Sequence, residues 1–274
     1  MMNNPIIEIN DLSVGYRDKI ILDDFNVSIY PGEIIGIVGC NGAGKSTLLK
    51  TIRGILPRIK GNIRYCGKNI DEINEKEFAK LVGYLQQNVE IGFGYTGKEI
   101  VLAGRYPHIK WWESESVEDE KIALGCMEYT GTRHLADRPV NEVSGGQKQR
   151  ILLAKVIAQQ TPILFLDEPT TGLDFVYQEE IFRFAKELAF MGKTVLIVIH
   201  ELKLAAKYCE RILLLGDGQL LADGNPDMVF TEVLLSRAYK ANVKVVKDSV
   251  GNIIEITTSN ISRHNMRSLK NIYG

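Results

Sequence analysis

Apolar and polar positions alternate along the first part of the chain. Phe25, Val27 and Ile29 share one face of a segment with a period of two residues, which predicts a β-strand buried on one side. The run EIIGIVG, which ends at Gly39, is apolar on both faces, as expected for a strand of a parallel sheet that helices cover on both sides. The later runs PILFLDEP and TVLIVIH have the same character. These patterns predict a mainly parallel sheet.

Helical segments separate these strands, so the predicted fold class is α/β. We expect one helix to follow the glycine-rich loop after Gly39 and to run through Leu56, because Pro57 cannot continue it. Loops and helices are expected over residues 88–160. The segment RILLLGDGQLLADG predicts a hairpin, and the stretch after Ala241 predicts a smaller hairpin followed by a frayed tail.

Composition and charge fit a globular chain with a sizeable core. Of 274 residues, 45% are hydrophobic and 24% are charged, and the formal net charge is -1. A near-neutral chain has no overall basic field, so a nucleic-acid partner is not expected. The longest apolar runs are far shorter than the roughly 20 residues that cross a bilayer, and the first residues lack the pattern of a secretory signal. The four cysteines are widely separated, which predicts free cytosolic thiols rather than disulfides or a metal site.

The loop GCNGAGKST carries the clearest chemistry in the sequence. Its spacing from Gly39 to Ser46 fits GxxxxGK[ST], between a predicted strand and a predicted helix, which is the context of a phosphate-binding P-loop. We expect Lys45 to reach the β and γ phosphates of ATP, Ser46 to ligate Mg²⁺, and Thr47 to help hold the α phosphate. A glycine turn that binds nothing is the weaker alternative. The nucleotide contacts are also expected to include Asn41, Gly42, Ala43 and Gly44.

Two acidic residues end the buried strand ILFL. A P-loop needs a carboxylate that positions its metal, and Asp167 is expected to do so. Because neighbouring side chains at the end of a strand diverge, Glu168 is free to polarise the attacking water as a general base. Paired acids also occur by chance at strand ends, so this assignment depends on the P-loop upstream.

A second glycine-rich turn, SGGQ, precedes another predicted helix. Ser144 is suited to cap that helix, and Gly145 and Gly146 leave amides exposed at its positive end. The turn could be only a capped helix start, or it could be a second phosphate-binding site. One nucleotide cannot easily use both helix starts of the same chain.

Together these motifs resemble the ATP-binding-cassette (ABC) ATPases over residues 5–240. VSGGQ resembles the signature motif of that family, with Val143 where leucine is more usual, and the match runs to Gln147. TGLD, which ends at Asp174, is similar to the D-loop. His200 matches the switch histidine that would contact the γ phosphate, and Tyr16 resembles the aromatic residue on which adenine stacks.

The family also has a glutamine that senses Mg²⁺ and touches the transport partner. In YLQQN this residue could be Gln86 or Gln87, and the usual ending of the preceding strand favours Gln87. The proline that normally stands before this glutamine is missing here.

The resemblance implies a P-loop NTPase core with an antiparallel β subdomain and a helical subdomain. Residues 1–240 would form the nucleotide-binding domain, with the helical subdomain at 88–160, and residues 241–274 a small C-terminal extension. It also implies that two copies of the chain face each other head to tail, with each ATP between the P-loop of one copy and Ser144 of the other. Transmembrane permease subunits would hold this homodimer at the inner face of the cell membrane and act with a solute-binding protein.

The segment GRYPH, from Gly104 to His108, resembles a stretch frequent in importer ATPases for iron-siderophore, haem and cobalamin complexes. The C-terminal stretch GDGQLLADGNPDMVFTEVLLSRAYKANV is similar to the same group. No chemistry follows from the residues of GRYPH themselves, and Tyr106 and Pro107 would serve equally well as a packing turn. The resemblance therefore implies import of an iron complex or cobalamin, driven by ATP hydrolysis.

Three other classes of protein share part of this pattern. A soluble mechanochemical ABC ATPase generally carries two cassettes or long heptads, and neither is visible here. A nucleotide sensor that does not hydrolyse ATP needs neither Glu168 nor His200. A P-loop kinase should have a lid and an acceptor site in place of SGGQ.

Overall fold

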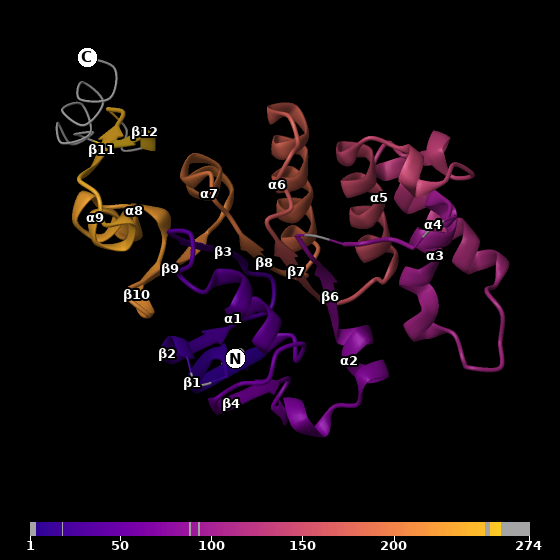
Figure 1. Ribbon diagram of the computed structural model, residues 1–274, viewed down its shortest axis with the longest axis horizontal. Helices are drawn as coiled ribbons and strands as arrows, with labels where there is room; N and C mark the ends of the chain where they lie inside the picture. Colours follow the sequence, from indigo (N-terminus) through magenta and orange to yellow (C-terminus); the bar gives the residue numbers. More distant parts are fainter. Residues whose placement is uncertain (1–3, 18, 88, 93, 250–252, 259–274) are drawn as a thin grey trace, which may run out of the picture.

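The structure of the protein is a computed structural model that describes residues 4–17, 19–87, 89–92, 94–249 and 253–258. A six-stranded sheet lies at its centre (Figure 1). The strands follow one another across the sheet as β10 (Gln219–Gly224), β9 (Arg211–Gly216), β3 (Ile34–Gly39), β8 (Thr194–Val198), β7 (Ile163–Asp167) and β6 (Val82–Leu85). β9 and β10 pair antiparallel as the predicted hairpin, and the other neighbours are parallel.

The inner strands of this sheet are covered on both faces. Every residue of β3, β7 and β8 is buried, which confirms the prediction from their two-sided apolar pattern. Because the carboxyl ends of parallel strands meet at one edge, the residues that follow β3, β6, β7 and β8 are brought together there. That edge holds most of the residues to which the sequence assigns chemistry.

A second, antiparallel sheet lies below the first in Figure 1. Its strands are β2 (Lys19–Ile29), β1 (Ile7–Tyr16), β4 (Lys60–Tyr65) and β5 (Lys68–Asn69), in that order. Helix α1 (Lys45–Ile52) lies between the two sheets, where Leu48, Leu49 and Ile52 join one core with residues of both. The helix that begins at the P-loop is therefore fixed from both sides.

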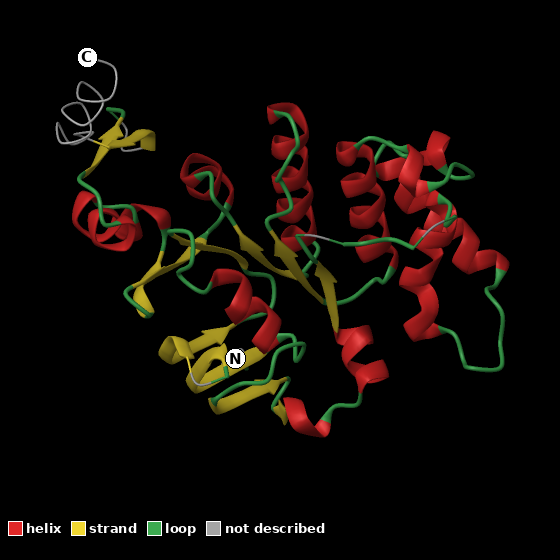
Figure 2. Cartoon of the chain, viewed as in Figure 1, coloured by secondary structure: helices red, strands yellow, loops and turns green. Residues whose placement is uncertain are grey.

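A helical part forms its own small core beside the central sheet (Figure 2). It contains α3 (Gly97–Leu102), the 3₁₀ segment η2 (Ala103–His108), α4 (Val117–Tyr129), the short turns η3 (Arg133–Leu135) and η4 (Val140–Glu142), and α5 (Gly145–Ala158). Val101, Met127 and Ile151 meet in this core. These helices fall within the stretch for which the sequence predicts loops and helices, of which residues 88 and 93 lie outside the described residues.

The remaining helices lie outside the helical part, and most of them contact the central sheet. They are η1 (Ile70–Glu72), α2 (Glu75–Leu81), α6 (Phe175–Phe190), α7 (Leu202–Tyr208), α8 (Pro226–Val229) and α9 (Glu232–Tyr239). A two-stranded hairpin follows, of β11 (Val243–Lys247) and β12 (Ile253–Thr258), at the position of the second predicted hairpin. The predicted frayed tail falls on residues 259–274, outside the described residues. Within the described part of the chain, no helix combines the length and apolar character that crossing a membrane requires.

The predicted end of the helix after the P-loop was wrong. α1 ends at Ile52, not at Leu56. Gly54 adopts a left-handed backbone with φ of +81°, its amide donates to the carbonyl of Thr51, and the amide of Ile55 donates to Lys50. This is a Schellman arrangement, in which glycine closes the last turn of a helix. The helix therefore stops before Pro57 has any effect.

Candidate functional site

The P-loop joins β3 to α1 at the carboxyl edge of the sheet. Gly44 is the N-cap of α1 with φ of +95°, and a Cβ atom there would lie 2.9 Å from the side chain of Ile21. Gly42 also has a positive φ, of +82°. A side chain at Gly44 would therefore strain the backbone and clash with Ile21. The loop leaves the first amides of α1 facing outward, which is the polarity that binds phosphate.

Lys45 is buried inside this loop. Its Nζ donates to the carbonyl oxygens of Gly39 at 2.8 Å and Cys40 at 3.0 Å. Burial lowers the pKa of Lys45, and the nearby charge of Glu168 opposes that shift. The ammonium group is thus held at the centre of the loop by two carbonyls, which phosphate oxygens could replace.

Ser46 and Asp167 come together from α1 and β7. The Ser46 hydroxyl donates to one Asp167 oxygen at 2.7 Å, and the hydroxyl of Tyr84 on β6 donates to the other at 3.1 Å. Asp167 is almost completely buried, and this desolvation raises the pKa of its carboxyl group. A hydroxyl and a carboxylate side by side are oxygen donors of the kind that Mg²⁺ prefers. The pair therefore fits the predicted metal site.

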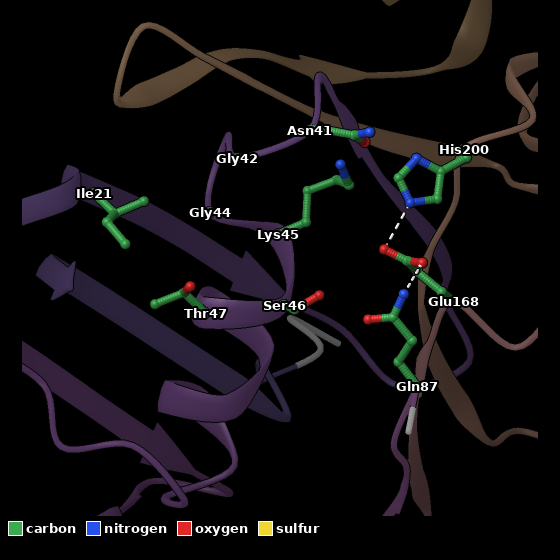
Figure 3. Close-up of a pocket in the computed structure, with 10 residues that line it drawn as sticks. All are labelled: Ile21, Asn41, Gly42, Gly44, Lys45, Ser46, Thr47, Gln87, Glu168 and His200. Carbon is green, nitrogen blue, oxygen red and sulfur yellow. Dashed lines mark hydrogen bonds and ion pairs between the residues drawn. The ribbon is translucent and has the colours of Figure 1, made fainter. Parts of the chain in front are cut away.

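Glu168 follows directly and points to two further predicted residues (Figure 3). His200 Nε2 lies 2.6 Å from one of its carboxylate oxygens, and the side-chain amide of Gln87 donates to the other. The backbone of Glu168 is left-handed, with φ of +51°, which is uncommon for a residue with a side chain. Asp167 and Glu168 thus diverge as predicted, one toward Ser46 and the other toward His200 and Gln87.

These groups surround one pocket of about 490 Å³ (Figure 3). Its walls come from β2, the P-loop, α1, and the residues after β6, β7 and β8. The lining residues are Ile21, Asn41, Gly42, Gly44, Lys45, Ser46, Thr47, Gln87, Glu168 and His200. Of the two glutamines left open by the sequence, Gln87 is the one at this pocket.

Several other predicted residues do not line the pocket. Ser144 forms a capping box with Gln147 at the start of α5, and both Ser144 and Gly145 are exposed. Asp174 caps α6 by accepting hydrogen bonds from two backbone amides. Tyr16 is half exposed at the end of β1. These residues can contact a nucleotide only if the nucleotide extends beyond this pocket or if a second chain meets the pocket. They are Ser144, Gly145, Gly146, Gln147, Asp174 and Tyr16.

Two residues at the site were missed from the sequence. Tyr84 holds Asp167, and its position three residues before Gln87 on a buried strand is the only signal that could have indicated it. Ile21 forms a wall of the pocket although it is far from the motifs along the chain. It reaches the P-loop only through packing of the two sheets, so no sequence pattern identifies it.

The structure gives GRYPH a physical role that its sequence did not indicate. The buried guanidinium of Arg105 donates to the carbonyl of Ala158 at 2.7 Å and to the side chain of Gln160 at 2.8 Å. His108 Nε2 bonds the carbonyl of Gln159 at 2.8 Å. A Cβ atom on Gly104 would lie 2.3 Å from a carbonyl of α5, so glycine is required for this approach. GRYPH thus holds the C-terminal end of the helix that begins after Ser144.

A parallel sheet with a P-loop, a buried aspartate and a glutamate at its carboxyl edge defines a P-loop nucleotide hydrolase. The family model for ABC transporters matches residues 22–171. The chain belongs to this family and is an ATPase of it, and its fold class is the one predicted.

Curated relatives match nearly the whole chain. The iron(3+)-hydroxamate import ATP-binding protein FhuC of Bacillus subtilis is 37% identical over 86% of this chain and 88% of its own length. The ferric enterobactin transport ATP-binding protein FepC of Escherichia coli is 36% identical over 87% of this chain and 89% of its own length. The hemin import ATP-binding protein HmuV of Gloeobacter violaceus is 39% identical over 86% and 88%.

Solved structures agree with this assignment. An inward-facing transporter described as of the metal-chelate type has a TM-score of 0.80 at 25% identity, covering 94% of this chain and 99% of the other. The ATP-binding cassette MJ0796, solved as a dimer bound to ADP and phosphate, has a TM-score of 0.72 at 27% identity, covering 80% and 98%.

Proposed function

We propose that this chain is the ATP-hydrolysing subunit of an importer for an iron complex, either a siderophore or haem. The observation that carries the proposal is the convergence of Lys45, the Ser46–Asp167 pair and the Glu168–His200 pair on one pocket. A protein that only sensed ATP would need no carboxylate held beside a histidine at the position of the attacking water. The import role rests on the names of the relatives.

In the proposed site, phosphate oxygens replace the two carbonyls that now accept from Lys45. Ser46 and Asp167 would hold Mg²⁺, and Gln87 would complete the site through its carbonyl oxygen, since its amide nitrogen faces Glu168. Bound Mg²⁺ neutralises charge that develops on the phosphates. Thr47 and the amides of residues 41–44 would surround the α and β phosphates, and Tyr16 would stack on adenine.

Glu168 is the proposed general base. Its carboxylate can accept the proton of the attacking water, while the side-chain amide of Gln87 fixes its orientation. His200 would turn to the γ phosphate when ATP is bound. The attacking water must be aligned with both the Glu168 carboxylate and the γ phosphate. Hydrogen bonding to Glu168 therefore helps catalysis by holding this carboxylate in position.

We further propose that turnover needs two copies of the chain. The start of α5, where Ser144 and Gly145 are exposed, does not line the pocket of its own chain. A second copy placed head to tail would bring them, with its Asp174 loop, to the γ phosphate. The dimeric MJ0796 cassette supports this arrangement by its likeness to this chain.

The proposed partners are transmembrane permease subunits, which would hold the dimer at the cytoplasmic face of the membrane. A solute-binding protein would act on the far side of the permease. The chain itself would not select the solute, so the choice among siderophore and haem complexes lies with these partners.

Two measurements test the proposal. ATP hydrolysis by the purified chain should require Mg²⁺ and should disappear in Lys45→Ala. A strain that lacks the gene should lose uptake of one radiolabelled iron chelate or of haem, and the wild-type gene but not Lys45→Ala should restore it. Loss of cobalamin uptake alone would contradict the iron assignment, and unchanged uptake of all three would contradict the import role.

A further inference from the structure

Tyr84 reaches Asp167 from the neighbouring strand and from outside the nucleotide pocket. β6 and β7 run parallel and side by side (Figure 1), in a register that pairs Tyr84 with Phe165, the residue two before Asp167. The hydroxyl of Tyr84 donates to one carboxylate oxygen of Asp167 at 3.1 Å. Tyr84 does not line the pocket itself. Its contact with the site is therefore made through Asp167.

Each oxygen of the Asp167 carboxylate has its own hydrogen-bond donor. The Ser46 hydroxyl donates to Oδ1 at 2.7 Å, and Tyr84 donates to Oδ2. Because Ser46 is itself a proposed metal ligand, Oδ1 is the oxygen that would face a metal bound there. Asp167 is almost completely buried, and a hydrogen bond to a charged group in such a place is costly to break. The bond from Tyr84 therefore opposes any rotation of the carboxylate that would turn Oδ2 toward the metal.

Mg²⁺ and Ca²⁺ differ in how they use a carboxylate. Mg²⁺ takes about six oxygen ligands in a strict octahedron and keeps several of its waters, so one oxygen from a carboxylate suits it. Ca²⁺ takes about six to eight oxygens in a looser arrangement and often binds both oxygens of one carboxylate. A carboxylate that can offer only one oxygen is therefore adequate for Mg²⁺ but leaves Ca²⁺ short of a ligand.

We propose that Tyr84 determines the metal specificity of the site, because it restricts Asp167 to one metal-facing oxygen and so favours Mg²⁺ over Ca²⁺. Tyr84 is a positioning residue in this role, since its hydroxyl acts on Asp167 and not on the reacting atoms. The proposal rests on the proposed function, which places Mg²⁺ at Ser46 and Asp167. Loss of a hydrogen-bond partner of a metal ligand commonly changes metal affinity by about 10–100-fold.

The hydroxyl of Tyr84 can be removed without removing its ring. The ring packs against the core that α1 shares with both sheets, so Tyr84→Phe keeps this apolar contact and loses the bond to Asp167. Tyr65→Phe is the matched control. The Tyr65 hydroxyl is buried and donates to the carbonyl of Ile52, at the opposite end of α1 from Ser46. Both variants lose one tyrosine hydroxyl, but only Tyr84→Phe changes the surroundings of Asp167.

Equilibrium binding of ATP tests the proposal without relying on turnover. The full chain carries Glu168→Gln so that ATP is retained, and equilibrium dialysis measures its affinity for radiolabelled ATP in Mg²⁺ and in Ca²⁺ at the same free concentration. In this background we expect ATP to bind about tenfold more tightly with Mg²⁺, a preference that Tyr65→Phe should leave in place. Tyr84→Phe should bring the two affinities within about threefold of each other. Tyr84→Met, which lacks the same hydroxyl, should behave as Tyr84→Phe does.

Competition between the two cations gives a second measurement. With Glu168 in place, Ca²⁺ should inhibit Mg²⁺-dependent hydrolysis at an about tenfold lower concentration in Tyr84→Phe than in Tyr65→Phe. A loss of activity in Tyr84→Phe without this shift would indicate a purely structural role for the hydroxyl, and it would contradict the proposal.

The outcomes distinguish failure of this proposal from failure of the proposed function. If the Mg²⁺ preference is the same in Tyr84→Phe and Tyr65→Phe, or is absent before Tyr84 is changed, Tyr84 does not set the metal specificity and the proposed function stands. If the wild-type chain binds and hydrolyses ATP equally well without any divalent cation, the metal site of the proposed function is refuted, and the role of Tyr84 with it.

Discussion

At the scale of single residues, Glu168 separates ATP binding from ATP hydrolysis. Glu168→Gln keeps the size of the side chain, and its carbonyl oxygen can still accept from the Gln87 amide, but the basic carboxylate is removed. We expect ATP affinity to stay within a few fold while the rate of hydrolysis falls by about 10²–10⁴, the contribution of a positioned general base. Single-turnover hydrolysis and equilibrium binding measure the two separately. Undiminished hydrolysis in this variant would exclude Glu168 as the base.

Cys40 provides a second test at this scale, because its thiol lies within the P-loop and is partly accessible. We expect N-ethylmaleimide to modify Cys40 in the free protein and saturating ATP to protect it. Cys66 is exposed in the turn between β4 and β5 and serves as the internal control, since its labelling should not respond to ATP. Mass spectrometry of the labelled peptides gives the extent of labelling at Cys40 and at Cys66. If ATP changed neither of them, the P-loop would not be the nucleotide site.

The sequence predicted those pocket residues that belong to a short motif. Lys45, Ser46, Asp167 and Glu168 all lie within the P-loop or directly at a strand end, so their positions follow from local structure. Tyr84 and Ile21 reach the site only through packing between strands that are distant along the chain. Such contacts have no local signal, and this is why both residues were missed.

At the scale of elements, GRYPH is the segment that fixes α5. Arg105→Met keeps the aliphatic part of the side chain but removes a buried guanidinium that bonds α5 and Asp119. Breaking a buried pair in this way should cost about 3–5 kcal/mol in the free energy of unfolding. Urea denaturation measures this loss.

The control for this variant is Arg58→Met. Arg58 pairs with Asp71 through both of its terminal nitrogens, but Asp71 is largely exposed, whereas the pair of Arg105 and Asp119 is buried. An exposed pair contributes about 0–1 kcal/mol, so the control should lose far less stability. Equal losses in the two variants would show that Arg105 does not hold α5.

The sequence predicted helices and strands where the apolar positions recur regularly. It predicted the ends of these elements less accurately. The buried strands follow from uninterrupted apolar runs, and α6 and both late hairpins lie where the patterns indicated. α1 ends where it does because Gly54 takes a left-handed conformation. Gly54 precedes Pro57 along the chain, so the helix ends before the proline can stop it. GRYPH had no predicted role because its partners lie on α5, far along the chain.

At the scale of the whole molecule, the account requires Ser144 to act on the nucleotide of another copy. Ser144→Arg should spare ATP binding at the P-loop but prevent hydrolysis, because the larger side chain blocks closure of the two copies. Ser116→Arg is the matched control, since Ser116 caps α4 through the same capping box. Each variant should lose about 1 kcal/mol of stability through its cap. Only Ser144→Arg should lose hydrolysis, and equal activity of the two would refute the role of Ser144.

The most direct measurement is a cross-link between two differently tagged copies. One copy carries Asn41→Cys at the P-loop and the other Ser144→Cys, both with Glu168→Gln and with the native cysteines replaced by serine. With a short bismaleimide, ATP should produce a covalent pair that contains both tags, and omission of ATP should abolish it. If saturating ATP is bound but no mixed pair forms, each chain holds its nucleotide alone and the head-to-tail site is contradicted.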